Sequence, residues 1–234
     1  MVYAKELWFH SMVTRRNIQR QQIRDEIKTI ARQQMVKDGP AGLSLNAIAK
    51  QMGVAVSGLY RYFDGRDALL TALIVDAFNA HGDAMQAHAD AAPRDNYSAR
   101  MMGAMWGYRA WALENKSEFA LIYGTPIPGY VAPREETVPA AQRSLTVIYS
   151  TMLEAFNVGA IKPIEPASEQ AYPKLVDTGV PPSLAYWGAR GWSRIHGIIT
   201  LEVFEHLQGL VSDMDGFYRA ECLTLLAEAG LPAP

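Results

Sequence analysis

The sequence predicts an all-α protein with a three-helix helix-turn-helix head followed by a larger C-terminal helical region. Apolar residues recur at the i, i+3, i+4 spacing of a buried helix face in successive segments of the 234-residue chain. A glycine turn separates two short helices between residues 45 and 63. Four prolines in residues 124–139 and five in 158–182, against two in the first 120, indicate two long loops. We expect residues 1–16 to form an arm, 17–65 the head and 66–234 the second domain.

The first helix of the head is expected from about Asn17 to Val36, with Gly39 as its stop. Its inward face consists of Ile23, Ile27, Ile30, Ala31 and Met35. Residues 1–16 are expected as a poorly ordered arm. Either Met12 is the true initiator, or residues 1–11 are a native extension of that arm.

Two short helices complete the head. The first has Ser44 as its N-cap and ends at Gly53, because glycine tolerates the left-handed backbone of a tight turn. The second runs from about Val56 to Phe63. The inward residues of the pair are Leu45, Ile48, Ala49, Met52, Leu59 and Phe63. Two helices joined in this way form a helix-turn-helix, whose second helix can enter the DNA major groove.

The run GVAVSGLYRYFDGRDALL, residues 53–70, resembles the DNA-binding signature of tetracycline-repressor-type (TetR) transcription regulators. The likeness rests on Gly53-Val54, Leu59-Tyr60, Tyr62-Phe63, Arg66 and the leucines that open the next helix. Ala55 departs from the pattern, since many members carry Ser or Thr there, a hydroxyl that can cap the helix and touch phosphate. The resemblance implies a DNA-binding regulator whose C-terminal domain binds a ligand and dimerises.

The DNA-binding residues follow from this resemblance and from position. Tyr60 and Arg66 are expected at the DNA backbone, with Ser44 beside the groove. Arg61 is the best candidate for a bidentate contact to guanine. Asn46 and Tyr62 are further polar candidates. The short side chains expected to face the groove are Val56, Ser57 and Gly58.

The charge distribution agrees with a DNA-binding head. Residues 1–66 carry a balance of +6 and the remaining residues −8, although the whole chain has a formal charge of only −2. Such an asymmetry points to a polyanion-binding end, for which a solvated basic helix face is the alternative. Within the arm, Arg15, Arg16 and Arg20 can reach the DNA backbone or minor groove.

A helix from about Asp64 to near His88 is expected to link the two parts. The resemblance implies that this helix transmits ligand-driven movement to the head. His81 and His88 on it, and the later pair Glu202 and His206, are expected to be surface pairs rather than metal ligands.

The ligand site is expected where four helices converge beneath the two proline-rich loops. The residues chosen for it are Met102, Trp106, Arg109, Tyr123, Met152, Phe156 and Trp192. They come from helices over about 97–116, 119–123, 136–157 and 183–208. Arg109 is the unusual member, because a charge on an apolar face needs a partner, either a core carboxylate or an acidic ligand.

The last two helices are expected from about Ser183 to Gln208 and from Ser212 to Ala229. The first is apolar on both sides, which argues that a second subunit covers one of them. The proposed homodimer interface consists of Trp187, Ile198, Leu201, Leu223 and Leu226. The residues Trp192, His196 and Gly197 also resemble the hallmark of a TetR C-terminal class named WHG for them.

Other classes of function find little support. The sequence has no G-x-S-x-G, G-x-G-x-x-G, P-loop, H-E-x-x-H or zinc-type cysteine pattern, so we expect no enzyme, cofactor or metal. With the single Cys222 and no long apolar run, the chain is expected to be cytoplasmic. The leading hypothesis is a repressor released from its DNA operator by a small apolar or amphipathic ligand. The alternatives are a ligand-independent architectural DNA binder and an all-helical enzyme with scattered catalytic residues.

Overall fold

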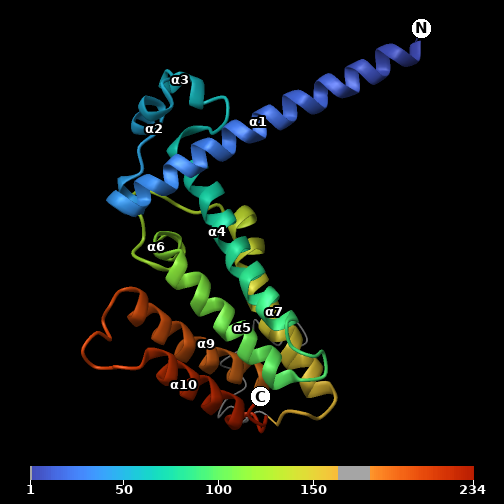
Figure 1. Ribbon diagram of the computed structural model, residues 1–234, viewed down its shortest axis with the longest axis vertical. Helices are drawn as coiled ribbons and strands as arrows, with labels where there is room; N and C mark the ends of the chain where they lie inside the picture. Colours follow the sequence, from blue (N-terminus) through green and yellow to red (C-terminus); the bar gives the residue numbers. More distant parts are fainter. Residues whose placement is uncertain (1, 163–179) are drawn as a thin grey trace. The chain divides into compact units, whose positions relative to one another are not determined.

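The computed structural model describes the backbone of residues 2–162 and 180–234 and the side chains from Arg16 onward outside that gap. Every regular element in these ranges is helical, which confirms the all-α class (Figure 1). The elements are α1 (Val2–Asp38), the 3₁₀ turn η1 (Pro40–Gly42), α2 (Leu45–Met52), α3 (Val56–Leu59), α4 (Gly65–Asp90), α5 (Tyr97–Glu114), α6 (Lys116–Tyr123), α7 (Arg134–Asn157), α9 (Pro182–Val203) and α10 (Met214–Glu228).

The helices form two compact units. The first, called here the head unit, comprises residues 1–76 and 117–137, and the second, the regulatory unit, comprises residues 77–116 and 138–234. Helix α4 is one uninterrupted helix whose first part belongs to the head unit and whose last part belongs to the regulatory unit. The boundary expected at residue 66 therefore lies inside the first unit.

The head unit closes around apolar residues from α1, α2, α3 and the start of α4. Its fully or nearly fully buried members include Ile27, Met35, Ile48, Leu59, Phe63, Leu69 and Leu73. The inward faces predicted for α1 and α2 are confirmed, except that Ile23 and Met52 are only half-buried. Val54, beside the turn, is 47% exposed.

The expected start of the first helix is wrong. Helix α1 begins at Val2 rather than Asn17, so the backbone expected to be a poorly ordered arm is helical. Residues 2–38 contain neither glycine nor proline, and nothing in that stretch ends the helix. Helix α7 begins at Arg134, close to the expected Glu136, and Pro139 lies inside it, where it removes only one helix hydrogen bond near the N-terminal end.

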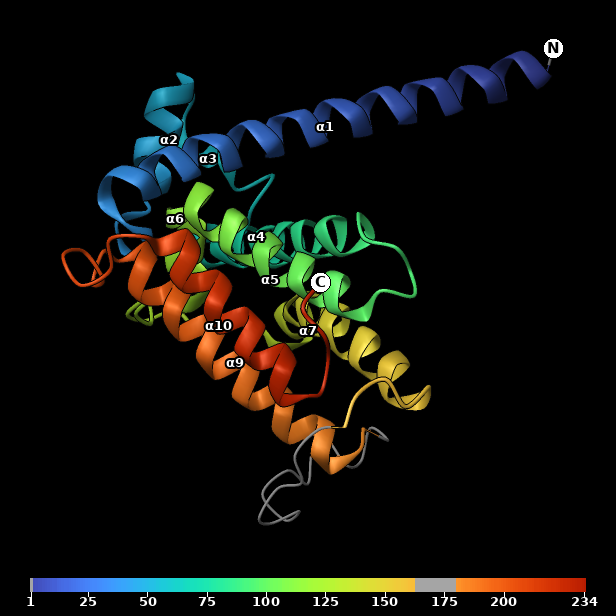
Figure 2. The same cartoon turned by 60° about the horizontal axis from the view of Figure 1, so that its bottom comes forward.

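The regulatory unit is a bundle of α5, α7, α9, α10 and the last part of α4. Helices α9 and α10 run side by side and both pack on α5 (Figure 2). Tyr108, Leu184, Ile199 and Tyr218 are almost completely buried between them. A proline-rich loop is expected over residues 158–182. Residues 163–179 of it lie outside the part of the chain that the structure describes.

Candidate DNA-binding surface and ligand cavity

The helix-turn-helix is held by local caps. Ser44 has an extended backbone (φ −134°), and its hydroxyl accepts a hydrogen bond from the Ala47 N–H at 3.4 Å. Gly53 adopts the left-handed conformation (φ 69°), and the next N–H, of Val54, donates to the Ala49 carbonyl at 3.0 Å. The predicted N-cap and stop of α2 are therefore confirmed. Ala55 begins α3 without a side-chain cap, as its methyl group requires.

The second helix of the motif is shorter than expected but presents the expected surface. It ends at Leu59 rather than Phe63, and Tyr60 continues with helical dihedral angles. Leu59 and Phe63 turn inward, whereas Ser57 and Arg61 are exposed and Tyr60 is 54% exposed. Asn46 on α2 is also exposed, while Val56, Gly58 and Tyr62 are half-buried. The polar residues predicted to read DNA are thus accessible from outside the chain.

Two arginines of α1 support this surface by donating to main-chain carbonyls. Arg24 donates to the Tyr62 carbonyl and lies 4.1 Å from the centre of the Phe63 ring. Arg20 donates to the carbonyl of Arg61 at 3.3 Å. Arg20 and Arg24 are four residues apart and therefore lie on one side of α1. This spacing is the feature of the sequence from which their shared role in supporting the helix-turn-helix could have been predicted. Carbonyls carry no net charge, and no carboxylate in the described part of the chain forms an ion pair with Arg20 or Arg24, so both keep their positive charge.

Arg66, predicted at a DNA phosphate, also braces the head. Its Nε donates to the Leu43 carbonyl at 2.9 Å and its Nη2 to the Ala41 carbonyl at 3.0 Å. About a third of its side chain, 31%, is exposed. A guanidinium has five N–H donors, so these bonds leave others for a phosphate.

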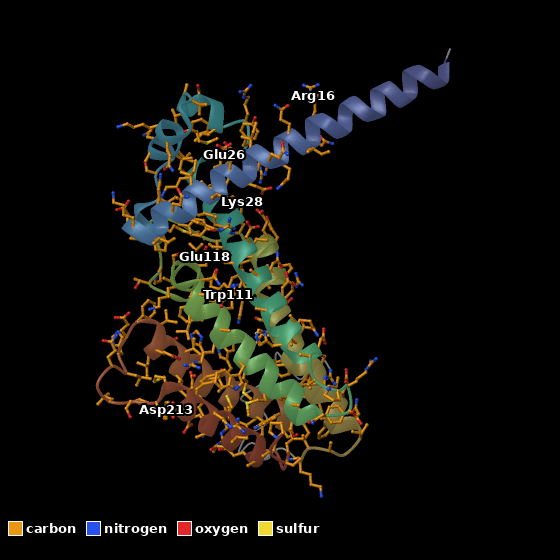
Figure 3. All side chains as sticks on the ribbon, in the orientation of Figure 1. Arg16, Glu26, Lys28, Trp111, Glu118 and Asp213 are labelled. Atoms are coloured by element: carbon orange, nitrogen blue, oxygen red, sulfur yellow. The ribbon has the colours of Figure 1, made fainter. Side chains whose placement is uncertain are left out.

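A solvent-open hollow lies between α1 and the residues that follow α3. Arg16, Arg20, Arg61 and Tyr62 contribute to its walls. The side chain of Arg16 stands on α1 in Figure 3. The side chain of Arg15, the third arginine proposed for the arm, lies outside the described residues. The hollow therefore gathers cations beside the residues expected to read bases.

A mainly apolar cavity lies within the regulatory unit. It offers about 80 Å³ to the centre of a water-sized sphere. Its walls come from α4, α5, α7, α9 and α10, and include Met85, Met101, Met105, Tyr108, Tyr149, Met152, Trp187, Trp192, Ile195 and Leu226. A concave, mainly apolar space of this kind is typical of a small-molecule site.

The cavity contains two of the seven residues chosen for it from the sequence. Met152 and Trp192 line it, whereas Met102, Trp106, Arg109 and Phe156 do not. Tyr123 belongs to the head unit. On α5 the lining face carries Met101, Met105 and Tyr108, about one residue before the face that we chose. Apolar side chains surround this helix, so periodicity alone does not select one face.

Arg109 is paired with protein carboxylates, which decides between the two partners left open above. Its Nε and Nη2 donate to the two oxygens of Glu202 at 2.7 and 2.6 Å, and Nη1 donates to Asp215 at 2.7 Å. The rings of Trp106 and Tyr218 lie 5.2 and 5.1 Å from the guanidinium carbon. Arg109 thus ties α5 to α9 and α10.

Two histidines adjoin the aromatic wall of the cavity. His81, expected at the surface, is completely buried and contacts the rings of Tyr108 and Trp111 at centroid distances of 4.2 and 5.0 Å. Burial, with a smaller repulsion from His196, lowers the pKa of His81 to about 3. His196 is bonded through Nδ1 to the Tyr108 hydroxyl at 2.5 Å and stacks on Trp192. Trp111 lies on α5 (Figure 3).

Some of the residues predicted for a dimer interface are buried within the regulatory unit, and others are exposed on its surface. Trp187 and Leu226 line the cavity, and Ile198 is 9% exposed. Leu201 is 43% exposed, and Leu223 is half-buried. The sequence pattern identified apolar faces of α9 and α10 but did not show which one the chain covers itself.

The described residues bring no three His, Cys, Asp or Glu side chains together in a way that could hold a metal ion. Glu202, expected to form a surface pair with His206, is instead largely buried and bonds to Arg109. Separately, none of the helices over residues 2–162 and 180–234 is long and apolar enough to span a membrane.

Two family models match the chain. Residues 29–73 match that of the bacterial regulatory proteins of the tetR family, and residues 101–225 match the tetracyclin repressor-like C-terminal domain. The second match includes Trp192, His196 and Gly197. The chain belongs to the TetR family of DNA-binding transcription regulators.

Relatives of similar length agree with this assignment. The HTH-type transcriptional regulators Mb1846 of Mycobacterium bovis and Rv1816 of Mycobacterium tuberculosis are each 30% identical over 227 residues, which cover 92% of this chain and 95% of the relative. Among solved structures, the putative regulatory protein SCO4313 matches with a TM-score of 0.77 and 34% identity over 90% of this chain and 98% of the other. RolR, solved in complex with resorcinol, shares the fold at a TM-score of 0.55 and 19% identity, covering 93% and 92% of the two chains.

Proposed function

We propose that this regulator is a homodimeric repressor that leaves its DNA operator when a small, mainly apolar molecule enters the cavity of the regulatory unit. The observation that carries the proposal is an apolar cavity inside a chain whose other unit is a DNA-binding head. Helix α4 contributes to both units, since it opens beside Arg66 and its Met85 lines the cavity. RolR, a protein of the same fold, binds a small aromatic molecule, which supports a ligand role for such a unit.

The proposed DNA contacts fall into two groups. Arg61, with Asn46 and Tyr62, reads base edges, and a bidentate contact from Arg61 to guanine contributes about 1 to 3 kcal/mol of discrimination. Tyr60 and Arg66 contact the DNA backbone, and Ser44 lies beside the groove. The short side chains of Val56, Ser57 and Gly58 let α3 approach the groove closely. Replacing Arg66 with alanine should lower the salt slope of binding by about one.

The proposed dimer uses the outward sides of α9 and α10. Leu201 and Leu223 lie there, together with Gly197, at which an added Cβ would meet nothing within 4 Å. A second subunit places a second head at a half-site about 34 Å away. Joining two heads raises operator affinity by about 10² to 10⁴ without any new contact in either head.

Selection of DNA fragments by the purified protein tests the function. We expect one enriched, two-fold symmetric sequence, and in Arg61→Ala a loss of preference at one position per half-site. Lys116→Ala is the matched control, because it removes one positive charge from the regulatory unit and leaves the head unchanged. Uniform weakening by Arg61→Ala would make Arg61 a phosphate contact. Fragments no different from random would indicate an architectural DNA binder instead.

Ligand release has a separate test. If a cavity ligand expels DNA, each of the two must weaken the other by the same factor. Titrations of the ligand with and without operator, and of operator with and without ligand, should give equal factors. A cavity ligand that binds equally well in both conditions would contradict release.

A further inference from the structure

The polar groups around the cavity restrict the chemistry of its ligand. The lining residues in the described part of the chain include no charged side chain. Two of the hydroxyls there have partners within the protein, since Ser144 donates to the Ala141 carbonyl at 3.1 Å and Tyr108 bonds to His196. A carboxylate or an ammonium group in this cavity would therefore lose its hydration without gaining an opposite charge.

Trp187 presents a donor that the protein does not use. Its side chain lines the cavity and is only 6% exposed. Its indole N–H is buried and has no hydrogen-bond partner among the described residues. Buried donors are nearly always paired in folded proteins, because an unpaired one has lost its water without replacement. An indole N–H only donates, so the missing partner must be an acceptor.

Tyr149 adds a second polar group near the same stretch of α9. An added Cβ on Gly188, the residue after Trp187, would lie 2.6 Å from the Tyr149 hydroxyl. Glycine at position 188 therefore leaves the space that this hydroxyl occupies. Burial raises the pKa of Tyr149, so the group is a neutral hydroxyl over the physiological range. Trp187 and Tyr149 are thus two polar members of a lining that otherwise consists mainly of methionine, aliphatic and aromatic side chains.

We propose that Trp187 is the hydrogen-bond donor that recognises the ligand, and that the ligand is an uncharged molecule with an apolar body and one carbonyl-type oxygen. The proposal rests on the proposed function in one respect, since it takes this cavity to be the ligand site. The Tyr149 hydroxyl can give the same oxygen a second hydrogen bond. Free carboxylic acids, ionised at neutral pH, are excluded by the uncharged walls.

A pair of probes of equal shape tests the donor. Acetophenone carries a carbonyl where α-methylstyrene carries a methylene group, and both are titrated calorimetrically into the full-length protein and Trp187→Phe. The smaller ring of the variant affects both probes, but only the ketone loses a hydrogen bond. We expect Trp187→Phe to weaken acetophenone about fivefold to tenfold more than it weakens α-methylstyrene. Equal weakening of the two probes would overturn the assignment.

A spectroscopic readout avoids any change in the wild-type fold. In protein with ¹⁵N-labelled tryptophan, the Trp187 indole resonance is identified by its loss in Trp187→Phe. Acetophenone should move this indole proton downfield, as hydrogen bonding does, and α-methylstyrene should not. If Tyr149→Phe rather than Trp187→Phe selectively weakens the ketone, Tyr149 is the recognising donor and the proposal fails.

The remaining outcomes separate this inference from the function on which it rests. Benzoate binding as tightly as acetophenone would overturn the uncharged class, and failure of both neutral probes to bind would overturn the ligand chemistry as a whole. Neither result affects operator selection by the head. A ketone that binds with full dependence on Trp187 but leaves operator affinity unchanged would uphold the donor and contradict ligand release.

Discussion

Helices α3 and α9 each contain a glycine that no contact among the described residues requires. A Cβ added at Gly58 or at Gly197 would meet no atom within 4 Å. Helix α5 differs, because a Cβ at its Gly103 would lie 2.4 Å from the His88 carbonyl oxygen and one at Gly107 2.6 Å from that of Ala84. A helical glycine costs about 1 kcal/mol relative to alanine. The glycines of α5 allow helices of one chain to pack, whereas Gly58 and Gly197 lie where the proposed DNA and dimer contacts would approach the backbone.

The two units also use arginine differently. In the head unit, Arg20 and Arg24 donate to uncharged carbonyls, so their positive charge remains available to DNA. In the regulatory unit, Arg109 is neutralised by Glu202 and Asp215. The arginines of α1 beside the helix-turn-helix therefore keep a positive field, in agreement with the balance of +6 over residues 1–66.

The largest expected effect comes from Gly197→Glu, which tests whether α9 meets a second copy. The monomer has room for the new side chain, but two copies would bring carboxylates together at the interface. Operator affinity should fall about 10² to 10⁴-fold as the two heads separate. Light scattering should report a folded monomer, and Gly197→Ala is the size control. A folded monomer with undiminished operator affinity would contradict the dimer.

Arg109→Met should cause the largest loss of stability. It leaves Glu202, whose side chain is only 12% exposed, as a buried charge without its partner. We expect the free energy of unfolding to fall by about 3 to 5 kcal/mol in denaturant titrations. Asp215→Asn is the control, because the Asp215 side chain is 78% exposed; it should cost less than about 1 kcal/mol. Equal costs for both would show that burial of the pair does not matter.

His81 predicts an acid-sensitive regulatory unit. Unfolded His81 binds a proton near pH 6.5, whereas in the folded state, packed against Tyr108, Trp111 and near His196, its pKa is about 3. The unfolded state therefore binds more protons between these values, and stability is lost as pH falls through that window. The slope should reach about 1.4 kcal/mol per pH unit. Denaturant titrations at pH 6.5 and 5 should show a flatter profile for His81→Phe; an unchanged slope would exclude His81 as the cause.

The smallest effect separates stability from DNA binding in the head. Gly58→Ala should stabilise the protein by up to about 1 kcal/mol, because alanine favours the helix and its methyl group meets nothing within the chain. The same methyl group should weaken operator binding if α3 approaches the groove closely. Thermal unfolding and operator titration on one sample measure both. Stabilisation with unchanged affinity would show that DNA does not approach this glycine.

The head was predictable because its signals are local. Ser44 and Gly53 act within a few residues of their positions, and the inward faces of α1 and α2 are narrow enough for periodicity to identify them. The extent of α1 was missed because the only signal for a helix over residues 2–16 was the absence of glycine and proline.

The cavity was less predictable because its helices are apolar on several sides. On α5, a choice of Met102 and Trp106 instead of Met101 and Met105 misplaces the lining by one residue, and no local signal corrects it. The partners of Arg109 are 93 and 106 residues away along the chain, so only the tertiary fold reveals them. Trp187 was assigned to the dimer because both the cavity and an outer interface require an apolar side chain.

The uncharged lining of the cavity has a consequence for the cell in which the protein works. DNA binding by the cationic head weakens steeply as ionic strength rises, because bound counterions are released from the DNA. Entry of a neutral molecule into a cavity without charges is nearly independent of ionic strength. Under the proposed coupling, a cell that concentrates its salts during osmotic stress loosens the operator complex while ligand affinity stays constant. A gene controlled by this operator would then respond to a lower ligand concentration. The ligand concentration needed for release would depend on the salt concentration of the cell as well as on ligand affinity.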